Sequence, residues 1–574
     1  MKLIKYFLCI AAIAFTISCG KGFLDSKPQG QIIPDQLGND RKSVEHALIG
    51  AYALMNGNIN GTWGNYSTAP SQWLFGDVAS DNAHKGSNSS DQSPMSDIEL
   101  HKVTSTNDNL PNFWRNYYEG IIRCNNTLQL LTKLQSGNAN DKLSAQRAKE
   151  IEGEAKMLRA HYYFFLKRVF LNVPYIDEKV TSTDDAVNTP NDKDVYPMIE
   201  ADLKTAIEKL DYTKPNKDVG RSDKFAAQAY LGKVYLYQKK YAEALALFKD
   251  VIDKKPDLVT MPYQNNFNVN TENGPESIFT VQHLINADGS GDNANVGDML
   301  SGLYGNAPVN CCGFFQPSVD LVNAYKVTAG GLPYLDGSYR NNPYVADLGL
   351  TGKDKDNYTP DQTIAFDPRL DYTVGRRGVP YLDWGIFPGD AWVRDPAYAG
   401  PFVGKKTMIN KADFPGNTVS GTNSITSLNV NIIRLSDVYL MAAECAVETG
   451  DLPYALKLVN AVRQRAATLP LLMINGRPAA AYNVKPYPDF ANADYARKAI
   501  RFERRLELAM EGHRFYDLVR WGIAKQVLEP YMEFEKKYAG SSQTIIYQNE
   551  DNYFPIPQNE LDRSGGILKQ NPGY

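Results

Sequence analysis

The sequence is poor in cysteine. Only 6 of its 574 residues are cysteines, and Cys124, Cys311, Cys312 and Cys445 are the four that lie beyond the N-terminal segment. They are too few and too scattered for a disulfide framework, and a chain of this length can bury a core without one. No CxxC motif or paired-histidine spacing accompanies them, so we expect no metal and no cofactor. The adjacent Cys311 and Cys312 fit either a vicinal disulfide or two free thiols.

Positive charge is also scarce. The chain has 61 Lys and Arg against 65 Asp and Glu, a formal net charge of −4. Cleavage after residue 18, which the N-terminal pattern predicts, would also remove Lys2 and Lys5 and leave 59 basic against 65 acidic side chains. No Lys/Arg run or basic stripe stands out. Because such a surface does not attract phosphates, nucleic acid is not an expected partner.

The standard catalytic motifs are missing. The sequence has no GxSxG elbow, no HExxH and no P-loop, which are the usual marks of hydrolases and nucleotide-binding proteins. A glycosidase needs two carboxylates about 5 to 10 Å apart in a cleft. With 65 acidic residues, any pair chosen from the sequence would be arbitrary.

One charged segment near the C-terminus could suggest catalysis, because His513 stands near Glu507 and Asp517. However, Glu503, Glu507 and Glu511 recur at i,i+4, where like charges weaken an isolated helix unless cations neutralise them. This pattern favours a structural network, and we expect no catalytic residue. The basic side chains expected to neutralise these carboxylates are Arg501, Arg504, Arg505 and Arg514.

No apolar run is long enough for an ordinary membrane helix. The longest, Tyr6 to Ile17, has about 12 residues, whereas spanning a bilayer takes about 20. It follows Lys2 and Lys5 and leads into small residues around Cys19. This order predicts an export signal peptide over residues 1–18.

The sequence Thr-Ile-Ser-Cys at the end of this segment resembles a bacterial lipobox, although Thr16 stands where Leu is commoner. Cys19 is therefore the predicted lipid attachment site, and residues 19–39 are a polar tether. Several acyl chains would hold the protein to a membrane, because each buried methylene adds about 0.8 kcal/mol. The alternative is a plain secreted protein with an incidental Cys19.

Residues 40–256 are predicted to be mainly helical, because apolar residues return every three or four positions. Each apolar stripe can be buried only against another helix, so the expected fold class is mainly α. One helix is expected to end before Pro174. The clearest stripe consists of Trp114, Tyr117, Ile121, Cys124, Leu128 and Leu131.

Tetratricopeptide spacing is the sharpest organisational signal. Small Gly232 and Ala244 would let two helices approach closely, and Ala443 and Ala455 repeat the same separation nearly 200 residues later. Because isolated repeats cannot bury their faces, other helix pairs must complete the stack. The first match comprises Gln228, Leu231, Gly232, Tyr235, Ala244, Phe248 and Pro256.

Residues 257–430 lack helical periodicity and are filled with Gly, Asn, Asp, Pro and aromatic residues. Irregular segments of this length are usually functional or disordered, and the many aromatic residues argue against disorder. We expect an ordered, loop-rich insert that carries the ligand-binding surface over the helical scaffold.

Sugar binding requires a flat aromatic face for the apolar side of a pyranose ring and planar polar groups for its hydroxyls. The stretch 376–394 offers both, with Tyr381, Trp384 and Trp392 as ligand-binding candidates. The alternative is that these rings only pin a long loop to the scaffold.

Several stretches, spread over nearly the whole mature chain, together resemble the SusD/RagB family of outer-membrane lipoproteins. The most specific is the run from Glu503 to Gly522, within the C-terminal region 431–574. The other matching stretches are Phe23-Leu24-Asp25, Gly153 to Tyr163, Phe366 to Leu370, Arg434 to Glu444, Asn460 to Arg463, Pro555-Ile556-Pro557 and Lys569 to Tyr574.

The resemblance implies a mostly helical fold with tetratricopeptide-like pairs, which sits as a lid on a SusC-like TonB-dependent transporter. It implies a surface-facing, lipid-anchored outer-membrane protein that binds an oligosaccharide and is not an enzyme. Peptide binding, as in RagB, is the alternative; a surface glycosidase or a purely structural scaffold is a weaker one. The stretch 73–85 resembles the family's early loop, which implies Asp81 and Asn82 as further ligand-binding candidates; a structural turn is the alternative.

Overall fold

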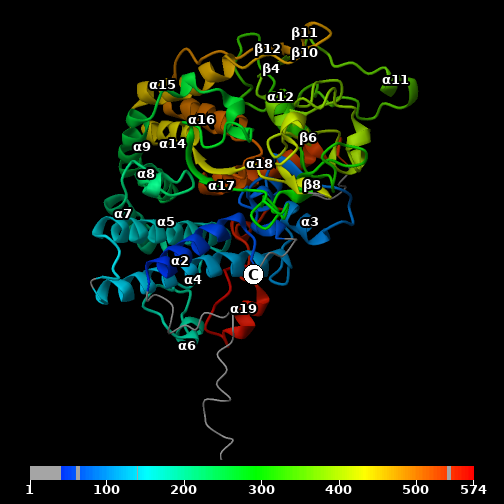
Figure 1. The fold of residues 1–574 in the computed structure, drawn as a ribbon. Coiled ribbons are helices and arrows are strands. Elements are labelled where there is room, and N and C mark those ends of the chain that lie inside the picture. The colour runs from blue at the N-terminus through cyan, green and yellow to red at the C-terminus, as the bar shows by residue number, and fades with distance from the viewer. Residues whose placement is uncertain (1–39, 60–64, 139, 420, 540–544) are drawn as a thin grey trace, which may run out of the picture.

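The computed structural model describes residues 40–574 except 60–64, 139, 420 and 540–544. The predicted signal peptide and Cys19 lie outside the described residues. Figure 1 shows the long helices gathered on one side of the molecule and the loop-rich segment around α12, β6 and β8 on the other. Within the described ranges, no helix combines the length and the apolar character needed to cross a membrane.

The N-terminal scaffold is a layer of antiparallel helices in which α5 packs between α4 and α7. The predicted stripe of α4 is buried from Trp114 to Leu131, which confirms the helical interpretation of this region. Helix α5 ends at Phe170, before Pro174 as expected. The helices of this layer are α2 (Arg41–Ala53), α4 (Asn109–Ser136), α5 (Ala145–Phe170) and α7 (Tyr196–Lys209).

The two tetratricopeptide-like matches form two helix pairs that stack on each other. In the first pair, a Cβ on Gly232 would lie only 2.5 Å from the Phe248 ring, so the close approach of α8 and α9 requires glycine there. Helix α9 packs directly against α14 of the second pair, although almost 200 residues separate the two matches. The pairs are α8 (Lys224–Tyr237) with α9 (Tyr241–Lys254), and α14 (Leu435–Glu448) with α15 (Leu452–Ala467).

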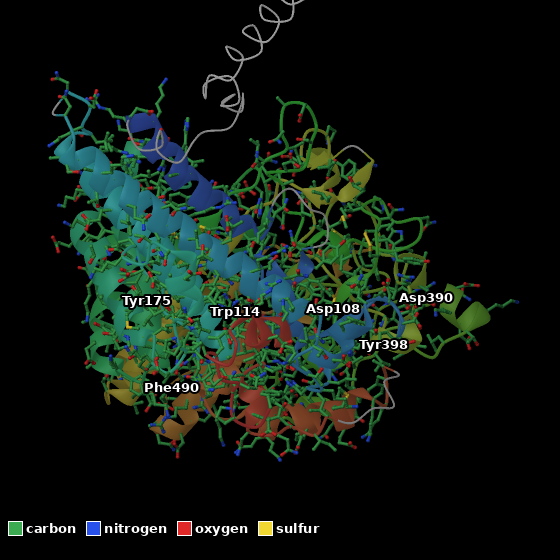
Figure 2. All side chains as sticks on the ribbon, turned by 90° about the horizontal axis from the view of Figure 1, so that it is seen from below. Asp108, Trp114, Tyr175, Asp390, Tyr398 and Phe490 are labelled. Atoms are coloured by element: carbon green, nitrogen blue, oxygen red, sulfur yellow. A yellow bond between two sulfur atoms is a disulfide. The ribbon has the colours of Figure 1, made fainter. Side chains whose placement is uncertain are left out.

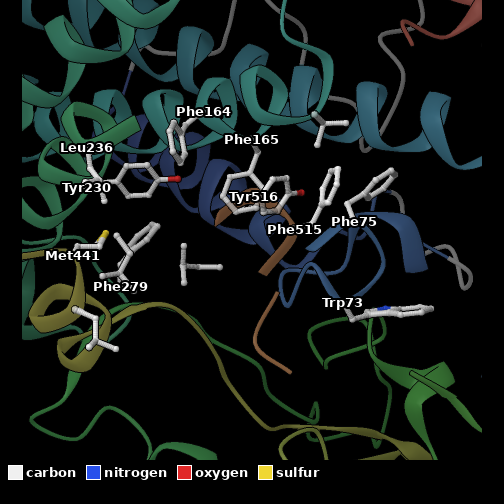
Figure 3. Packing of buried hydrophobic residues seen from close by; sticks show 14 of the residues in the cluster. Trp73, Phe75, Phe164, Phe165, Tyr230, Leu236, Phe279, Met441, Phe515 and Tyr516 are labelled. Atoms are coloured by element: carbon white, nitrogen blue, oxygen red, sulfur yellow. The ribbon is translucent and has the colours of Figure 1, made fainter. Parts of the chain in front are cut away.

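The C-terminal helices pass through the middle of the fold. Figure 3 shows Tyr516 of α17 beside Phe165 of α5, with Phe515 on the side of Phe75. The Arg168 guanidinium lies 4.0 Å from the centre of the Tyr516 ring, a cation–π contact that joins α5 to α17. These central helices are α16 (Ala493–Glu507), α17 (Arg514–Arg520) and α18 (Ala524–Glu535). The last helix, α19 (Gln558–Arg563), lies at the edge of the molecule and has no buried residue.

In the part of the chain that the structure describes, six two-stranded ladders join segments that are mostly far apart in the sequence. The longest joins β2 to β9 and leads directly into α14, so it ties the start of the loop-rich segment to its end. Five ladders are antiparallel and β12–β4 is parallel. The pairs are β1 (Ala83–Gly86) with β3 (Phe314–Pro317), β2 (Ser277–Val281) with β9 (Val430–Arg434), β4 (Ala365–Phe366) with β12 (Ala481–Tyr482), β5 (Val374–Gly375) with β6 (Val403–Gly404), β7 (Thr418–Val419) with β8 (Thr422–Thr426), and β10 (Met473–Ile474) with β11 (Arg477–Pro478).

The remaining helices are short, and four of them lie in the loop-rich segment. Figure 2 shows Asp390 and Tyr398 of this segment at the end of the molecule opposite Tyr175. The short helices are α3 (Ser93–Glu99), α6 (Thr183–Val187), α10 (Val319–Ala324), α11 (Gly352–Asp356), α12 (Leu370–Thr373) and α13 (Pro396–Ala399).

A buried ion-pair network fastens α16 to the loop-rich segment and to α15. Glu507 accepts hydrogen bonds from Arg369 at 2.9 Å and from Arg434 at 2.6 Å, and it also pairs with Arg465. We call this set the central network. Its five carboxylates are Glu276, Asp367, Glu503, Glu507 and Glu511, and its five cations are Arg369, Lys406, Arg434, Arg463 and Arg465.

The structural role expected for the charged C-terminal segment is present, but the predicted partners were wrong. Arg504 pairs with Asp437 and Asp517, Arg505 with Asp81 and Asp320, and Arg514 with Asp81, while Arg501 lies over the Trp521 ring. The ion pairs of Glu503, Glu507 and Glu511 in the described chain are with other cations. The central network takes its arginines from segments that are distant in the sequence.

Candidate functional site

Asp81 and Asn82 follow a short helical turn, η5 (Trp73–Val78), and both side chains are 1% exposed. Both carboxylate oxygens of Asp81 accept hydrogen bonds from Arg514, at 2.7 and 2.9 Å. Asn82 donates to Asp77 at 2.9 Å and accepts from Arg505 at 3.1 Å. The polar groups of these two ligand-binding candidates are thus used inside the protein, which favours the alternative of a structural turn.

The same turn meets the C-terminal motif at Gly512. A Cβ on Gly512 would lie 1.9 Å from the Ser71 carbonyl oxygen, and its φ of +74° also favours glycine. The backbone N–H of Gly512 donates to Asp77 at 2.6 Å. Burial lowers the pKa of His513 to about 3, so this imidazole is neutral at physiological pH. The segment is a structural junction.

A tight hairpin carries Trp384. Its ends meet at the Pro380–Ile386 bridge, and the Tyr381 N–H donates to the Gly385 carbonyl at 2.8 Å. The half-buried Trp384 indole donates to the Ile409 carbonyl at 2.9 Å, and its ring meets Phe414 edge to face at 5.5 Å. One edge of the indole is thereby fixed.

Trp392 ends the 3-10 turn η11 (Asp390–Trp392) and is half-buried. Its ring meets Tyr381 and Phe387 edge to face, at centroid distances of 5.8 and 5.6 Å. Tyr381 is only 1% exposed, and its hydroxyl donates to the Gly404 carbonyl at 2.6 Å. Tyr381, a predicted ligand-binding candidate, therefore supports the Trp392 ring from the inside, as in the alternative in which such rings pin the loop.

These rings rest on a small hydrophobic core that is separate from the main core. Trp384 and Trp392 lie at its edge, packed against buried side chains. Because a packed core fixes side-chain positions, the platform is rigid. The buried members are Leu303, Ala307, Val309, Tyr381, Phe387, Val393, Val403 and Met408.

Tyr304 lies beside Trp392 and was not predicted from the sequence. Its N–H donates to the Trp392 carbonyl at 3.1 Å, and the residue is 38% exposed. The Arg394 guanidinium lies 5.2 Å from the Tyr304 ring centre and donates to Asp91 at 2.6 Å. Tyr304 is followed by a glycine, as Trp384 is, and this shared pattern could have identified it.

We call Tyr304, Trp384 and Trp392, with Arg394 at the edge, the aromatic surface. A disulfide joins the neighbouring Cys311 and Cys312, and the Cys311 N–H donates to the Leu303 carbonyl at 2.6 Å. Of the two states left open by the sequence, the structure therefore has the vicinal disulfide. The hydrogen bond between Cys311 and Leu303 closes the loop that carries Tyr304.

The chemistry available on the aromatic surface is that of binding. Its rings offer flat apolar faces, and the Arg394 guanidinium is a fixed donor for hydroxyl oxygens. Within the described ranges, no three His, Cys, Asp or Glu side chains gather in a way that could hold a metal ion.

Comparison with protein families identifies the chain's relatives. The model of the SusD family matches residues 275–574, which is more than half of the chain. The chain belongs to the SusD family. A second model, described as starch-binding and associating with the outer membrane, matches residues 22–236. This finding confirms the resemblance to the SusD/RagB family.

Curated relatives match over nearly full length. The SusD-like protein P25 of Formosa agariphila is 25% identical over 100% of both chains. A SusD-like protein of Bacteroides ovatus is 23% identical over 99% of this chain and 91% of its own.

Solved structures share the fold. A laminarin-binding SusD-like protein aligns with a TM-score of 0.64 and 25% identity, covering 93% of this chain and 100% of its own. A SusD-like protein from Bacteroides fragilis aligns with a TM-score of 0.67 and 21% identity, covering 96% and 100%. The mainly α fold with helix pairs is therefore confirmed.

Proposed function

We propose that this chain is a non-catalytic outer-membrane lipoprotein that binds an oligosaccharide and delivers it to a SusC-like TonB-dependent transporter. The observation that carries the proposal is the aromatic surface, because it presents half-buried rings on a rigid core of their own. Membership of the SusD family supports it, as does the laminarin-binding relative at 25% identity.

In this proposal Trp384 and Trp392 stack on pyranose rings, Tyr304 extends the platform and Arg394 donates to hydroxyls. Fixed rings lose little conformational entropy when a ligand binds, which favours affinity. Tyr381 supports this surface from behind, and Asp81 and Asn82 hold the scaffold through Arg514 and Arg505.

We expect Trp384→Ala and Trp392→Ala each to weaken oligosaccharide binding about tenfold, and the double variant about a hundredfold. Each substitution removes a tryptophan contact worth about 1–2 kcal/mol, and 1.4 kcal/mol corresponds to a factor of ten. Isothermal titration calorimetry with laminari-oligosaccharides and a panel of other glucans, xylans and mannans measures the change.

Tyr212→Ala is a matched control, because this exposed tyrosine follows α7 on the helical side of the molecule. It should leave glycan affinity unchanged. Full affinity in the Trp384/Trp392 double variant would refute the proposed site. Binding of peptides but no glycan would favour the RagB-like alternative, and release of sugar products would favour an enzyme.

Lipid anchoring at Cys19 is part of the proposal. We expect Cys19→Ala to move the protein from the membrane fraction to the soluble fraction, because acylation requires the cysteine. Fractionation of cells, followed by immunoblotting, measures this redistribution. Cys9→Ala, a change within the predicted signal peptide, is the control that should leave the distribution unaltered. An unaltered distribution for Cys19→Ala would contradict the anchor.

A further inference from the structure

A cavity lies apart from the aromatic surface. It has a volume of about 450 Å³ and is formed by the segment after α9, the residues before β2 and the start of β9. None of Tyr304, Trp384, Trp392 or Arg394 lines it. Its size is within the range of about 300 to 1,000 Å³ that is usual for small-molecule sites.

The walls combine apolar and amide groups. Pro262 and Pro275 contribute apolar surface, while Asn266, Asn273 and Asn429 contribute planar amides. These amides are held in place: Asn266 donates to Glu276 at 2.7 Å, and the Asn273 and Gln282 amides bond to each other at 2.9 Å in both directions. Fixed amides can both donate to and accept from ligand hydroxyls.

Two carboxylates, Glu272 and Glu276, line the cavity, and they differ in whether the protein supplies a counter-ion. Glu276 belongs to the central network and pairs with Arg434 at 2.8 Å and Arg465 at 2.6 Å. Its charge is therefore neutralised within the protein.

Glu272 has no such partner. It accepts one hydrogen bond, from the Asn429 backbone N–H at 2.6 Å, and no cation of the described chain acts on it. Burial raises the pKa of Glu272 to about 7, although the Asn429 hydrogen bond lowers it in part. A half-buried carboxylate without a counter-ion favours a ligand that brings a positive charge.

We propose that this cavity binds a small hydroxylated ligand that carries a protonated amine, the chemistry of an amino sugar. The ammonium group pairs with Glu272, and the wall amides take the hydroxyls. Beside a neutral sugar, Glu272 would gain no ion pair and would remain partly protonated at pH 7, and an anionic ligand would be repelled by its charged form. A bare divalent cation does not fit, because the described residues offer no group of three metal-binding side chains here.

Glucosamine is the probe for this site, with glucose and N-acetylglucosamine as neutral analogues, titrated into the full mature chain by calorimetry at pH 7. We expect glucosamine to bind at least tenfold more tightly than either analogue. Glu272→Gln keeps the acceptor for the Asn429 N–H but removes the charge, and it should reduce glucosamine affinity to that of glucose. Thr260→Trp, at the exposed rim of the cavity, should also abolish binding by blocking entry.

Glu243→Gln is the matched control, because Glu243 is exposed on α9 outside the cavity, and it should leave binding unchanged. The Trp384/Trp392 double variant should also retain glucosamine binding, so failure of this site and failure of the aromatic surface can be told apart. Equal affinity for the three sugars, no saturable glucosamine binding, or full affinity in Glu272→Gln would overturn the proposal.

Discussion

Replacing Glu507 by Gln is expected to lower the free energy of unfolding by about 3–5 kcal/mol, the range measured when one partner of a buried ion pair is removed. Glu507 is fully buried and contacts Arg369, Arg434 and Arg465. The neutral amide would leave an uncompensated positive charge inside the central network, which otherwise balances five carboxylates with five cations. Urea unfolding followed by circular dichroism measures the change.

Glu533→Gln provides the matched control. Glu533 is exposed on α18 and pairs only with Lys536, so the same chemical change should cost less than about 1 kcal/mol. Equal stability of the Glu507 and Glu533 variants would show that the central network does not depend on its charge balance.

Lowering the pH should weaken the central network and so reduce the stability of the protein. Burial opposes ionisation of Glu507, but the Arg465, Arg434 and Arg369 guanidinium groups hold its pKa well below the usual range. A carboxyl whose pKa is depressed on folding contributes stability that is present above the unfolded-state pKa of 4.5 and is lost as the pH falls through the folded-state pKa. Stability that depends on Glu507 is therefore complete at neutral pH.

The central network was only partly predictable from the sequence. The i,i+4 spacing of Glu503, Glu507 and Glu511 correctly indicated that these carboxylates need cations. It did not indicate which ones, because Arg369 and Arg465 come from segments that only the tertiary fold brings to α16. The helix pairs were predictable for the opposite reason, since Gly232 and Phe248 are close in the sequence and meet directly.

The candidate site was predictable to a similar extent. Trp384 and Trp392 stood out because large aromatic side chains in a Gly-rich loop need a partner, either a core or a ligand. Exposure could not be inferred for single residues: Tyr381, from the same loop, faces the small core, and Asp81 is enclosed by Arg505 and Arg514. Glu272 could not be predicted as a binding residue from the sequence, because the lack of a counter-ion depends on which side chains the fold places around it.

His84→Gln is expected to destabilise the protein by about 3–5 kcal/mol at pH 7, because His84 bridges two buried carboxylates. One ring nitrogen donates to Glu99 at 2.8 Å and the other to Glu535 at 2.9 Å. Burial alone would lower the pKa of His84, but the hydrogen bonds to Glu535 and Glu99 raise it to about 10. The bridging group is therefore an imidazolium, and glutamine in its place would remove the cation that joins the two carboxylates.

The pH dependence separates this role from simple packing. A histidine whose pKa rises on folding contributes stability that is complete below its unfolded-state pKa of 6.5 and is lost as the pH rises through the folded-state value of about 10. The difference in unfolding free energy between the unsubstituted protein and His84→Gln should therefore be largest near pH 6.5 and shrink towards pH 10. Exposed His46→Gln is the control and should show no such trend. A difference that stayed constant between pH 6.5 and pH 9.5 would mean that His84 acts through its shape and not through its charge.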